Sequence, residues 1–257
     1  MSDYVLGHSR PEIDRLQRQA EMLRPITERL LVAAGVEPGM RVLDIGCGPG
    51  DVSTLIADLV GPTGSVVGID PSPEALAVAR ERFRERDNVG FVQSDVDGYI
   101  GPADFDAAVC RYVLIHQKEP SDFLRRTSSL LRSGGLIALH EMDAARGVYS
   151  NPRLPLLHEV YDAICDTLIR PGTAFDVGGR LVGVFLDAGL PAPRVFSHTL
   201  VDSAPNSTVL SWTVDLAREV LPLTFDFDTL LERLQRAAGE SGSQIEFLPQ
   251  LCAWTRV

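Results

Sequence analysis

The sequence is poor in basic residues and has no paired cysteines. Lys and Arg number 24 against 35 Asp and Glu, which gives a formal net charge of −11. Because nucleic-acid binding depends on neutralising phosphates, this balance argues against a nucleic-acid partner. The absence of any C-x-x-C pair argues against a zinc site and a disulfide framework and indicates reduced thiols. The four cysteines are Cys47, Cys110, Cys165 and Cys252.

Long apolar runs are also missing. No segment approaches membrane-spanning length, and residues 1–8 lack the basic and apolar regions of a signal peptide. We therefore expect a cytoplasmic protein without a membrane partner. With 257 residues and 45% hydrophobic composition, the chain is long enough for one α/β domain with a full core.

A glycine turn is the most informative feature that the sequence does have. The apolar run 42–45 predicts a buried strand, and Gly46, Gly48 and Gly50 follow it before a helix begins at Asp51. A strand, a glycine turn and a helix N-terminus bring bare backbone close to a ligand. A dinucleotide fingerprint needs its third glycine at position 51, where a carboxylate instead competes with a pyrophosphate for the helix dipole. The spacing therefore favours a cofactor without a phosphate.

Acidic residues end the next two predicted strands. The strand 65–69 ends at Asp70, twenty positions after Gly50, where an acidic residue can accept both hydroxyls of a ribose. The strand 89–93 is followed by Asp95. Asp70 could also be a simple helix cap, but its distance from the glycine turn favours ribose binding. Asp95 could also be a solvated loop carboxylate instead of a ligand contact, and both interpretations stay open at this point.

Strands and helices alternate along the first half of the chain. Further strands are predicted at 105–110 and 136–141, with helices between them, and this pattern is typical of a parallel, doubly wound α/β sheet. Such sheets bind ligands at the carboxyl ends of their strands. The residues expected at that edge are Gly46, Asp70, Asp95, Arg111 and Glu141.

The remaining segments predict mostly helices. Helices are expected at 10–34, where Pro25 divides or kinks the segment, at 151–170 and at 177–188. A sixth strand is expected at 194–201, a long segment at 203–243, and a last strand at about 245–255. Because repeats and linkers are absent from the sequence, we predict a single domain over 1–257.

From Asp44 to Gly50 the chain resembles motif I of the class I S-adenosylmethionine-dependent methyltransferases. The resemblance covers about residues 40–140 and includes the segment 130–135 before the fifth strand. It implies a Rossmann-like, seven-stranded sheet with an antiparallel last strand, S-adenosylmethionine as cofactor and S-adenosylhomocysteine as its product. The cofactor contacts that it implies are Asp44, Gly46, Gly48, Gly50, Asp70, Pro71, Asp95, Val96 and Arg111.

The same resemblance predicts a lid over the cofactor. The core would span about 36–141 with the strands near 194–201 and 245–256, and the helical lid would come from about 1–34, 142–192 and 203–244. The lid would build an acceptor pocket and exclude water. Its candidate acceptor contacts are Tyr4, Glu141, Tyr161 and Trp212. These helices could instead extend the core or form a dimer interface, so a homodimer stays open.

Two residues near the end of the fourth strand have alternative roles. Arg111 could pair with the methionine carboxylate of the cofactor, bind the acceptor or lie at the surface. His116 could remove a proton as the catalytic base or could cap a helix. No metal is expected, since the fourth strand ends in Cys110 and Arg111 where a magnesium site needs carboxylates.

Methyl transfer to a small-molecule acceptor of secondary metabolism is the function that these features favour. Transfer from a sulfonium needs alignment and exclusion of water more than a protein nucleophile. Two alternatives stay open. One is an enzyme of the same fold that binds S-adenosylmethionine but catalyses another reaction, such as a cyclisation. The other is a non-catalytic cofactor-binding protein.

Overall fold

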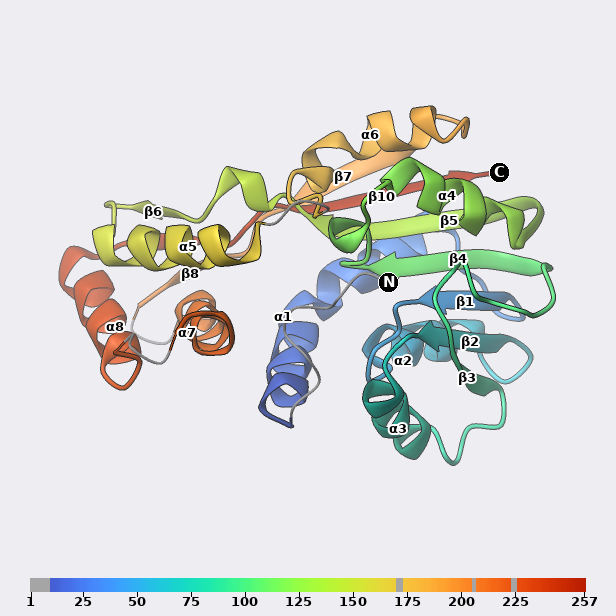
Figure 1. Cartoon of the computed structure of the whole chain (residues 1–257), viewed down its shortest axis with the longest axis horizontal. Coiled ribbons are helices and arrows are strands. Elements are labelled where there is room, and N and C mark those ends of the chain that lie inside the picture. Colours follow the sequence, from blue (N-terminus) through green and yellow to red (C-terminus); the bar gives the residue numbers. More distant parts are fainter. Residues whose placement is uncertain (1–9, 170–172, 205–206, 223–225) are drawn as a thin grey trace.

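A seven-stranded sheet forms the core of the molecule (Figure 1). The computed structural model describes residues 10–169, 173–204, 207–222 and 226–257, and side chains from residue 15 onward. The strand order is β3-β2-β1-β4-β5-β10-β7, and β10 runs antiparallel to both of its neighbours. The strands are β1 Arg41–Ile45, β2 Ser65–Asp70, β3 Val89–Gln93, β4 Phe105–Arg111, β5 Leu131–Met142, β7 Arg194–His198 and β10 Gln250–Arg256. This topology confirms the predicted Rossmann-like α/β fold.

Helices bury both faces of this sheet. One face packs against α1 (Arg10–Ala34) and α2 (Asp51–Val60). The other packs against α4 (Pro120–Ser129), α6 (Val177–Asp187) and the 3₁₀ turn η1 (Leu114–His116). The helix α3 (Pro73–Arg82) contacts β2 and β3. Successive strand residues point to opposite faces, and both faces are covered, so the central strands are apolar runs without alternation.

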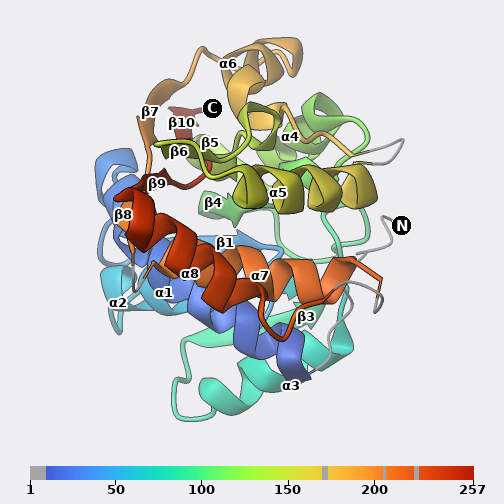
Figure 2. The ribbon, with the colours of Figure 1, turned by 90° about the vertical axis from the view of Figure 1, so that its left-hand side faces the viewer.

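A second group of elements stands beyond the carboxyl ends of the strands. It contains α5 (Pro155–Leu168), α7 (Thr208–Val220), α8 (Leu230–Ser241) and a small sheet of order β6-β9-β8. The strands of the small sheet are β6 Tyr149–Asn151, β8 Val201–Ser203 and β9 Gln244–Glu246. We call residues 149–168 and 201–246 the cap. In Figure 1 the arrow of β4 points toward the cap, and Figure 2 shows the cap in front of the sheet.

The small sheet corrects two predicted strands. The sequence predicted continuous strands at 194–201 and about 245–255, but each is broken, so that β7 and β10 belong to the core sheet and β8 and β9 to the cap. Pro249 lies at the second break and has no N–H for a sheet ladder. The turn is held instead by the Phe247 N–H, which donates to the Leu200 carbonyl at 2.9 Å. The cap therefore grows from two strands of the core sheet.

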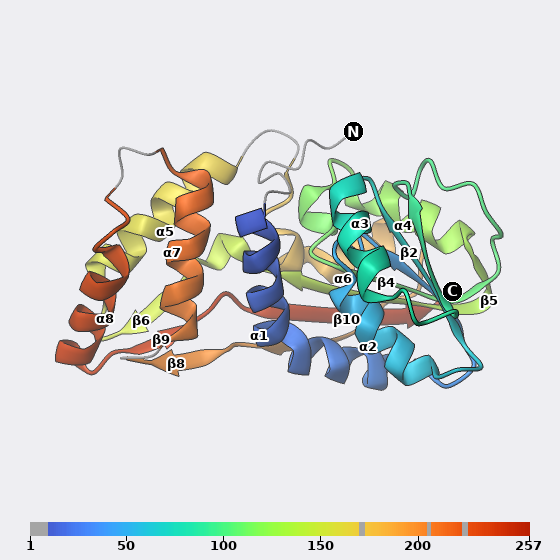
Figure 3. The same ribbon diagram turned by 90° about the horizontal axis from the view of Figure 1, so that it is seen from below.

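The lid boundaries also differ from the prediction. The helix α6 was expected in the lid, but its buried side chains pack with α4 and the core sheet. The helix α1 serves both parts, because it contacts α2 and β5 of the core and α7 of the cap (Figure 3). It continues through Pro25 and bends near its middle in Figure 3. One hydrophobic cluster includes residues of the core and of the cap. The single domain over 1–257 stays a prediction.

Candidate cofactor and acceptor site

A cavity of about 380 Å³ lies between the strand ends and the cap. Its walls come from α1, the β1–α2 turn, the ends of β2 to β5, η1, the end of α5, residues 173–175 and α7. This is the edge at which doubly wound sheets bind their ligands. Of the cofactor contacts that the sequence predicted, the cavity is lined by Gly46, Gly48, Asp70, Pro71, Asp95, Val96 and Arg111. Their roles in binding remain predictions.

The glycine turn is built on β2. The N–H groups of Gly46 and Cys47 both donate to the Ile69 carbonyl, at 2.8 and 3.0 Å, which fixes the turn against the next strand. Gly46, Gly48 and Gly50 have φ values of 68°, 51° and 88°. These left-handed conformations favour glycine. The local sequence therefore determines a turn whose backbone faces the cavity.

Asp44 and Gly50 support this turn from behind, which corrects their predicted contact with the cofactor. Neither is among the described residues that line the cavity. Asp44 is 1% exposed and accepts a hydrogen bond from the Ser53 hydroxyl at 2.5 Å. Burial raises the pKa of the Asp44 carboxyl to about 7. Gly50 packs against the Phe83 ring, which a Cβ would meet at 2.8 Å.

Asp70 connects the second strand to the glycine turn. Its Oδ2 accepts the Gly48 N–H and its Oδ1 accepts the Ser72 N–H, both at 2.9 Å. Ser72 in turn caps α3 by accepting the Ala75 N–H. A carboxylate oxygen has two lone pairs, so one oxygen can accept more than one hydrogen bond. Asp70 therefore both shapes the turn and lines the cavity.

We expect Asp70→Ala to weaken binding of S-adenosylhomocysteine by about 1–3 kcal/mol, because it removes acceptors from donors that the bound state buries. The variant also frees the Gly48 N–H, so part of the loss comes from the turn itself. Titration calorimetry measures the effect. Asp58→Ala, on the exposed side of α2, is the control and should bind normally. Equal affinity in the two variants would remove Asp70 from the site.

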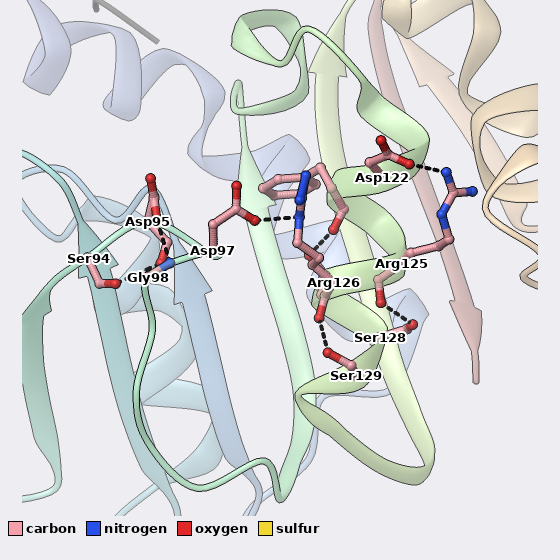
Figure 4. Close-up of polar contacts among 11 residues, drawn as sticks. Ser94, Asp95, Asp97, Gly98, Asp122, Arg125, Arg126, Ser128 and Ser129 are labelled. Atoms are coloured by element: carbon pink, nitrogen blue, oxygen red, sulfur yellow. Dashed lines mark hydrogen bonds and ion pairs between the residues drawn. The ribbon is translucent and has the colours of Figure 1, made fainter. Parts of the chain in front are cut away.

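The loop after β3 contributes Asp95 and Val96 to the cavity wall. Figure 4 shows the polar contacts of Asp95 and its neighbours in this loop. The Asp95 carboxylate is exposed and accepts the Gly98 N–H at 2.7 Å, which turns the loop. Two residues later, Asp97 forms an ion pair with Arg126 of α4, which fastens the loop to the neighbouring helix. The loop is therefore held at both sides of the position where the family resemblance implied contact with the cofactor.

Arg111 lines the cavity at the end of β4 and makes no ion pair with a described carboxylate. Its Nη1 donates to the Thr27 hydroxyl at 3.3 Å. Burial lowers the pKa of the Arg111 guanidinium, whereas the nearby acids Asp51 and Asp44 favour its charged form. Asp51 itself pairs with Arg82 at 2.8 Å. A half-buried cation in this position suits an anionic group of a ligand.

A buried polar network holds Arg111 in place. Thr27 contacts His140 Nδ1 at 2.9 Å, and His140 Nε2 lies 3.1 Å from the Gln250 oxygen. That oxygen also accepts the Tyr112 hydroxyl at 2.5 Å. Because the Gln250 oxygen can only accept, we assign the proton of His140 to Nε2. Burial, with the Arg111 charge, lowers the pKa of His140 to about 3, so the ring is neutral.

Glu141 does not contact the cavity, which corrects its predicted place in the acceptor site. It is fully buried, and its Oε1 accepts the Val113 and Leu114 N–H groups at 2.9 and 2.8 Å. Its Oε2 is buried without a hydrogen-bond partner in the described structure. Burial raises the pKa of Glu141 from 4.5 to about 8. The carboxyl therefore anchors η1 and stays protonated at neutral pH.

This pKa predicts that stability falls as the pH rises. Between about pH 4.5 and 8 the unfolded chain has released the Glu141 proton that the folded chain keeps, so the free energy of unfolding decreases through this window. Glu141→Gln keeps an acceptor for both N–H groups and should reduce the slope. Asp44 adds a similar contribution, which the variant retains. Melting temperatures at pH 5 and 8.5 test this, with the exposed Glu119→Gln as control, and an unchanged slope would contradict it.

The other predicted acceptor-site residues have different outcomes. Trp212 and His116 line the cavity. Burial lowers the pKa of His116 to about 4, so its ring is neutral at pH 7. The predicted contact of Tyr161 with the acceptor needs correction. Its hydroxyl donates to the Ala144 carbonyl at 2.9 Å, and Tyr161 is not among the described residues that line the cavity. Tyr4 lies outside the residues that the structure describes.

The sequence did not single out several residues of the cavity wall. Arg15 and Gln19 of α1 lie in the segment 1–34 that was expected in the lid, but their side chains had no assigned role. Tyr112 lines the cavity with a left-handed φ of 59°, the one described non-glycine residue with a positive φ. Met142 and Phe175 add apolar surface. Nothing in the local sequence distinguishes them, since only the fold brings them together.

The described ranges contain no group of three or more His, Cys, Asp or Glu side chains arranged to hold a metal ion. None of their helices has both the length and the apolar character needed to cross a membrane.

Comparison with known proteins agrees with the fold and the cavity. A family model described as a methyltransferase domain matches residues 36–168, just over half of the 257 residues. The chain belongs to the class I S-adenosylmethionine-dependent methyltransferases. The matched region contains the glycine turn and the ends of β1 to β5, so S-adenosylmethionine is the cofactor that this site serves.

Two of the relatives are named as methyltransferases of quinones. The ubiquinone/menaquinone biosynthesis C-methyltransferase UbiE of Ectopseudomonas mendocina is 38% identical over 133 residues, covering 50% of this chain and 49% of that protein. The 2-phytyl-1,4-naphtoquinone methyltransferase of Synechococcus elongatus is 31% identical over 170 residues, covering 64% and 70%. The chain thus spans about half the length of the first of these methyltransferases.

A solved structure shares the fold over most of the chain at low identity. The YcgJ protein of Bacillus subtilis has a TM-score of 0.59 and 19% identity, with 90% of this chain and 97% of that chain covered. At this identity the likeness concerns the fold alone. The coverage extends beyond the region that the family model matches.

Proposed function

We propose that this protein transfers the methyl group of S-adenosylmethionine to a small, partly apolar acceptor. The observation that carries the proposal is one cavity with two different walls. The ends of β1 to β3 and the start of α2 contribute carboxylates, while α1, α5, α7 and residues 173–175 contribute mainly apolar side chains. The carboxylates of the first wall suit a cofactor with two positive charges. The apolar side chains of the second wall suit an apolar acceptor, which loses its contact with water when it binds.

The residues present fit the cofactor. A Cβ at Gly48 would meet nothing within 4 Å and would enter the cavity, so the bare backbone leaves room for a ligand there. Asp70 and Asp95 offer acceptors for ribose hydroxyls and the adenine amino group. Arg111, held by Thr27, is placed to bind the methionine carboxylate. When bound, S-adenosylmethionine supplies a methyl group on a positively charged sulfur.

The chain's own contribution is orientation and exclusion of water. Positioning of two reactants can supply about 7–11 kcal/mol of the barrier. The apolar wall, with Trp212, Leu216 and Phe175, would hold the acceptor against the cofactor. His116 is neutral and lines the cavity, so it can accept a proton from an acceptor that releases one. The names of the quinone methyltransferases support an acceptor with an apolar ring.

Turnover with methyl-deuterated S-adenosylmethionine tests the function. The protein is incubated with a panel of quinols, phenols and aromatic acids, and both S-adenosylhomocysteine and deuterated product are measured by mass spectrometry. We expect both in equal amounts. A transformed acceptor without S-adenosylhomocysteine would indicate another reaction, such as a cyclisation, and cofactor binding without any turnover would indicate a binding protein. Placement in secondary metabolism and in the cytoplasm, and a homodimer, stay predictions from the sequence.

A further inference from the structure

The ends of β4 and β5 bring Arg111 and His140 together beside α1. The two residues are paired in the parallel register of these strands. Thr27 of α1 contacts both side chains, Arg111 Nη1 at 3.3 Å and His140 Nδ1 at 2.9 Å. On its other side the His140 ring reaches the Gln250 oxygen of β10, 3.1 Å from Nε2. Three elements distant in sequence thus join in one row of hydrogen bonds that ends at the cavity with Arg111.

Gln250 determines the direction of the hydrogen bonds in this row. Its Nε2 donates to the Leu248 carbonyl at 2.8 Å, so the amide cannot turn over and its oxygen faces His140. An amide oxygen only accepts, and His140 Nε2 must therefore carry the hydrogen. The other nitrogen of the neutral ring, Nδ1, is then an acceptor. Gln250 thus selects the tautomer of a histidine that is fully buried.

The Thr27 hydroxyl passes this direction on to Arg111. Its single hydrogen could go to His140 Nδ1, at 2.9 Å, or to the Leu23 carbonyl, at 3.2 Å. The shorter distance favours His140, and so does the cost of leaving a buried acceptor nitrogen without a donor. The lone pairs of the hydroxyl oxygen then remain for the Arg111 guanidinium, which can only donate.

A guanidinium that is held in this way is prepared for a carboxylate. The planar Arg111 group has five N–H donors, and the bond to Thr27 uses one hydrogen of Nη1. Pairing with a carboxylate depends on the orientation of the guanidinium plane, because the strong form uses two parallel hydrogen bonds. A side chain that is already ordered loses less freedom when the ligand binds. The row of hydrogen bonds therefore bears on affinity through Arg111.

We propose that Thr27, His140 and Gln250 are positioning residues that hold Arg111 toward the methionine carboxylate of the cofactor. The site then selects S-adenosylmethionine over its decarboxylated form. This inference rests on the proposed function and deepens it by naming the residues that determine specificity at the amino-acid end of the cofactor. None of the three is among the described residues that line the cavity, so each acts through Arg111.

The test compares S-adenosylhomocysteine with decarboxylated S-adenosylhomocysteine, a probe that lacks only the carboxylate. Both are titrated by calorimetry at about 0.15 M NaCl, where distant charges are largely screened. We expect the natural protein to bind S-adenosylhomocysteine at least about tenfold more tightly than the probe, the factor that a hydrogen bond to a charged group supplies. Arg111→Gln should abolish this preference.

Thr27→Val is the decisive variant, because it keeps the branched shape and removes the hydroxyl. The preference should fall below about threefold, while the affinity for the decarboxylated probe changes less than about threefold. Thr27→Ser keeps the hydroxyl and should keep the preference. Thr127→Val is the matched control at a buried threonine of α4, whose hydroxyl donates to the Phe123 carbonyl, and should bind both ligands normally. In the Arg111→Gln background, Thr27→Val should cause no further loss.

The tautomer of His140 is a second measurement, made on the natural protein. Nitrogen-15 NMR of the imidazole ring distinguishes a hydrogen on Nε2 from one on Nδ1. The chain has five histidines, and His140→Gln identifies the signal by its loss. We expect a neutral ring at pH 7 with its hydrogen on Nε2. This result and Arg111→Gln keep the proposal testable if Thr27→Val does not fold.

Several results would overturn the proposal. Equal affinity of the natural protein for both ligands, or a preference that survives Thr27→Val or Arg111→Gln, would separate the row from the carboxylate. An equal loss of both ligands in Thr27→Val, or the same loss in Thr127→Val, would assign the effect to general destabilisation. A hydrogen on His140 Nδ1 would reverse the order of the hydrogen bonds. If the natural protein bound neither ligand, the proposed function itself would fail.

Discussion

Gly48→Ala should lower the affinity for S-adenosylhomocysteine at least about tenfold, while Gly242→Ala should leave it unchanged. Both glycines have a positive φ, 51° and 64°, and at both a Cβ would meet no protein atom within 4 Å. Gly242 has the left-handed helical conformation, in which an alanine costs roughly 1–2 kcal/mol. The two glycines differ in their location. Gly48 lines the cavity, whereas Gly242 ends α8 and is not among the described lining residues.

Calorimetry of both variants, with melting temperatures measured beside it, checks this prediction. Similar losses of stability with a selective loss of binding in Gly48→Ala would show that the added methyl group occupies space that the cofactor needs. Normal binding by Gly48→Ala would place the cofactor elsewhere in the cavity. Equal weakening in both variants would assign the effect to backbone strain.

Trp212→Ala should destabilise the protein by about 3–5 kcal/mol, a large part of the stability of an ordinary domain. The ring is 6% exposed, packs edge-on against Phe247 with 4.7 Å between ring centroids, and donates to Gln19. It therefore joins α7, the segment between β9 and β10, and α1. Its removal leaves a void where the cap meets the helix that covers the core.

Trp212→Phe separates stability from function. It keeps a ring beside Phe247 but loses the donor to Gln19 and part of the cavity wall, so we expect a higher KM for the acceptor with unchanged affinity for S-adenosylhomocysteine. Tyr161→Phe is the matched control in the cap. It removes one buried hydrogen bond, to the Ala144 carbonyl, and should cost about 1 kcal/mol without changing KM. Equal changes in acceptor and cofactor binding in Trp212→Phe would contradict a cap that serves the acceptor.

The sequence by itself determined the strands up to β5 and the part of the cavity wall that the ends of β1 to β3 and the glycine turn form. The apolar run before Gly46, the spacing to Gly50 and the position of Asp70 are local features, and each specifies a strand, a turn or a strand end without distant residues. The family resemblance supplied the antiparallel last strand. This local information was also enough to place Asp95 and Arg111 at the same edge, where the structure has them.

Only the tertiary structure decided which of these side chains reach the cavity. Glu141 follows an apolar strand as Arg111 does, but it turns inward because the N–H groups of η1 need an acceptor. Asp44 likewise lies behind the turn, where it accepts a hydrogen bond from Ser53, although the resemblance implied a contact with the cofactor.

The cap depended still more on contacts between distant segments. Whether 194–201 and 245–255 are continuous strands depends on how β8 and β9 pair with β6, a pairing that no local pattern encodes. The orientation of the Gln19 amide depends on Trp212, 193 positions away in the chain. Local periodicity specifies elements and their ends, whereas the direction of a polar side chain depends on which partners the fold brings within hydrogen-bond distance.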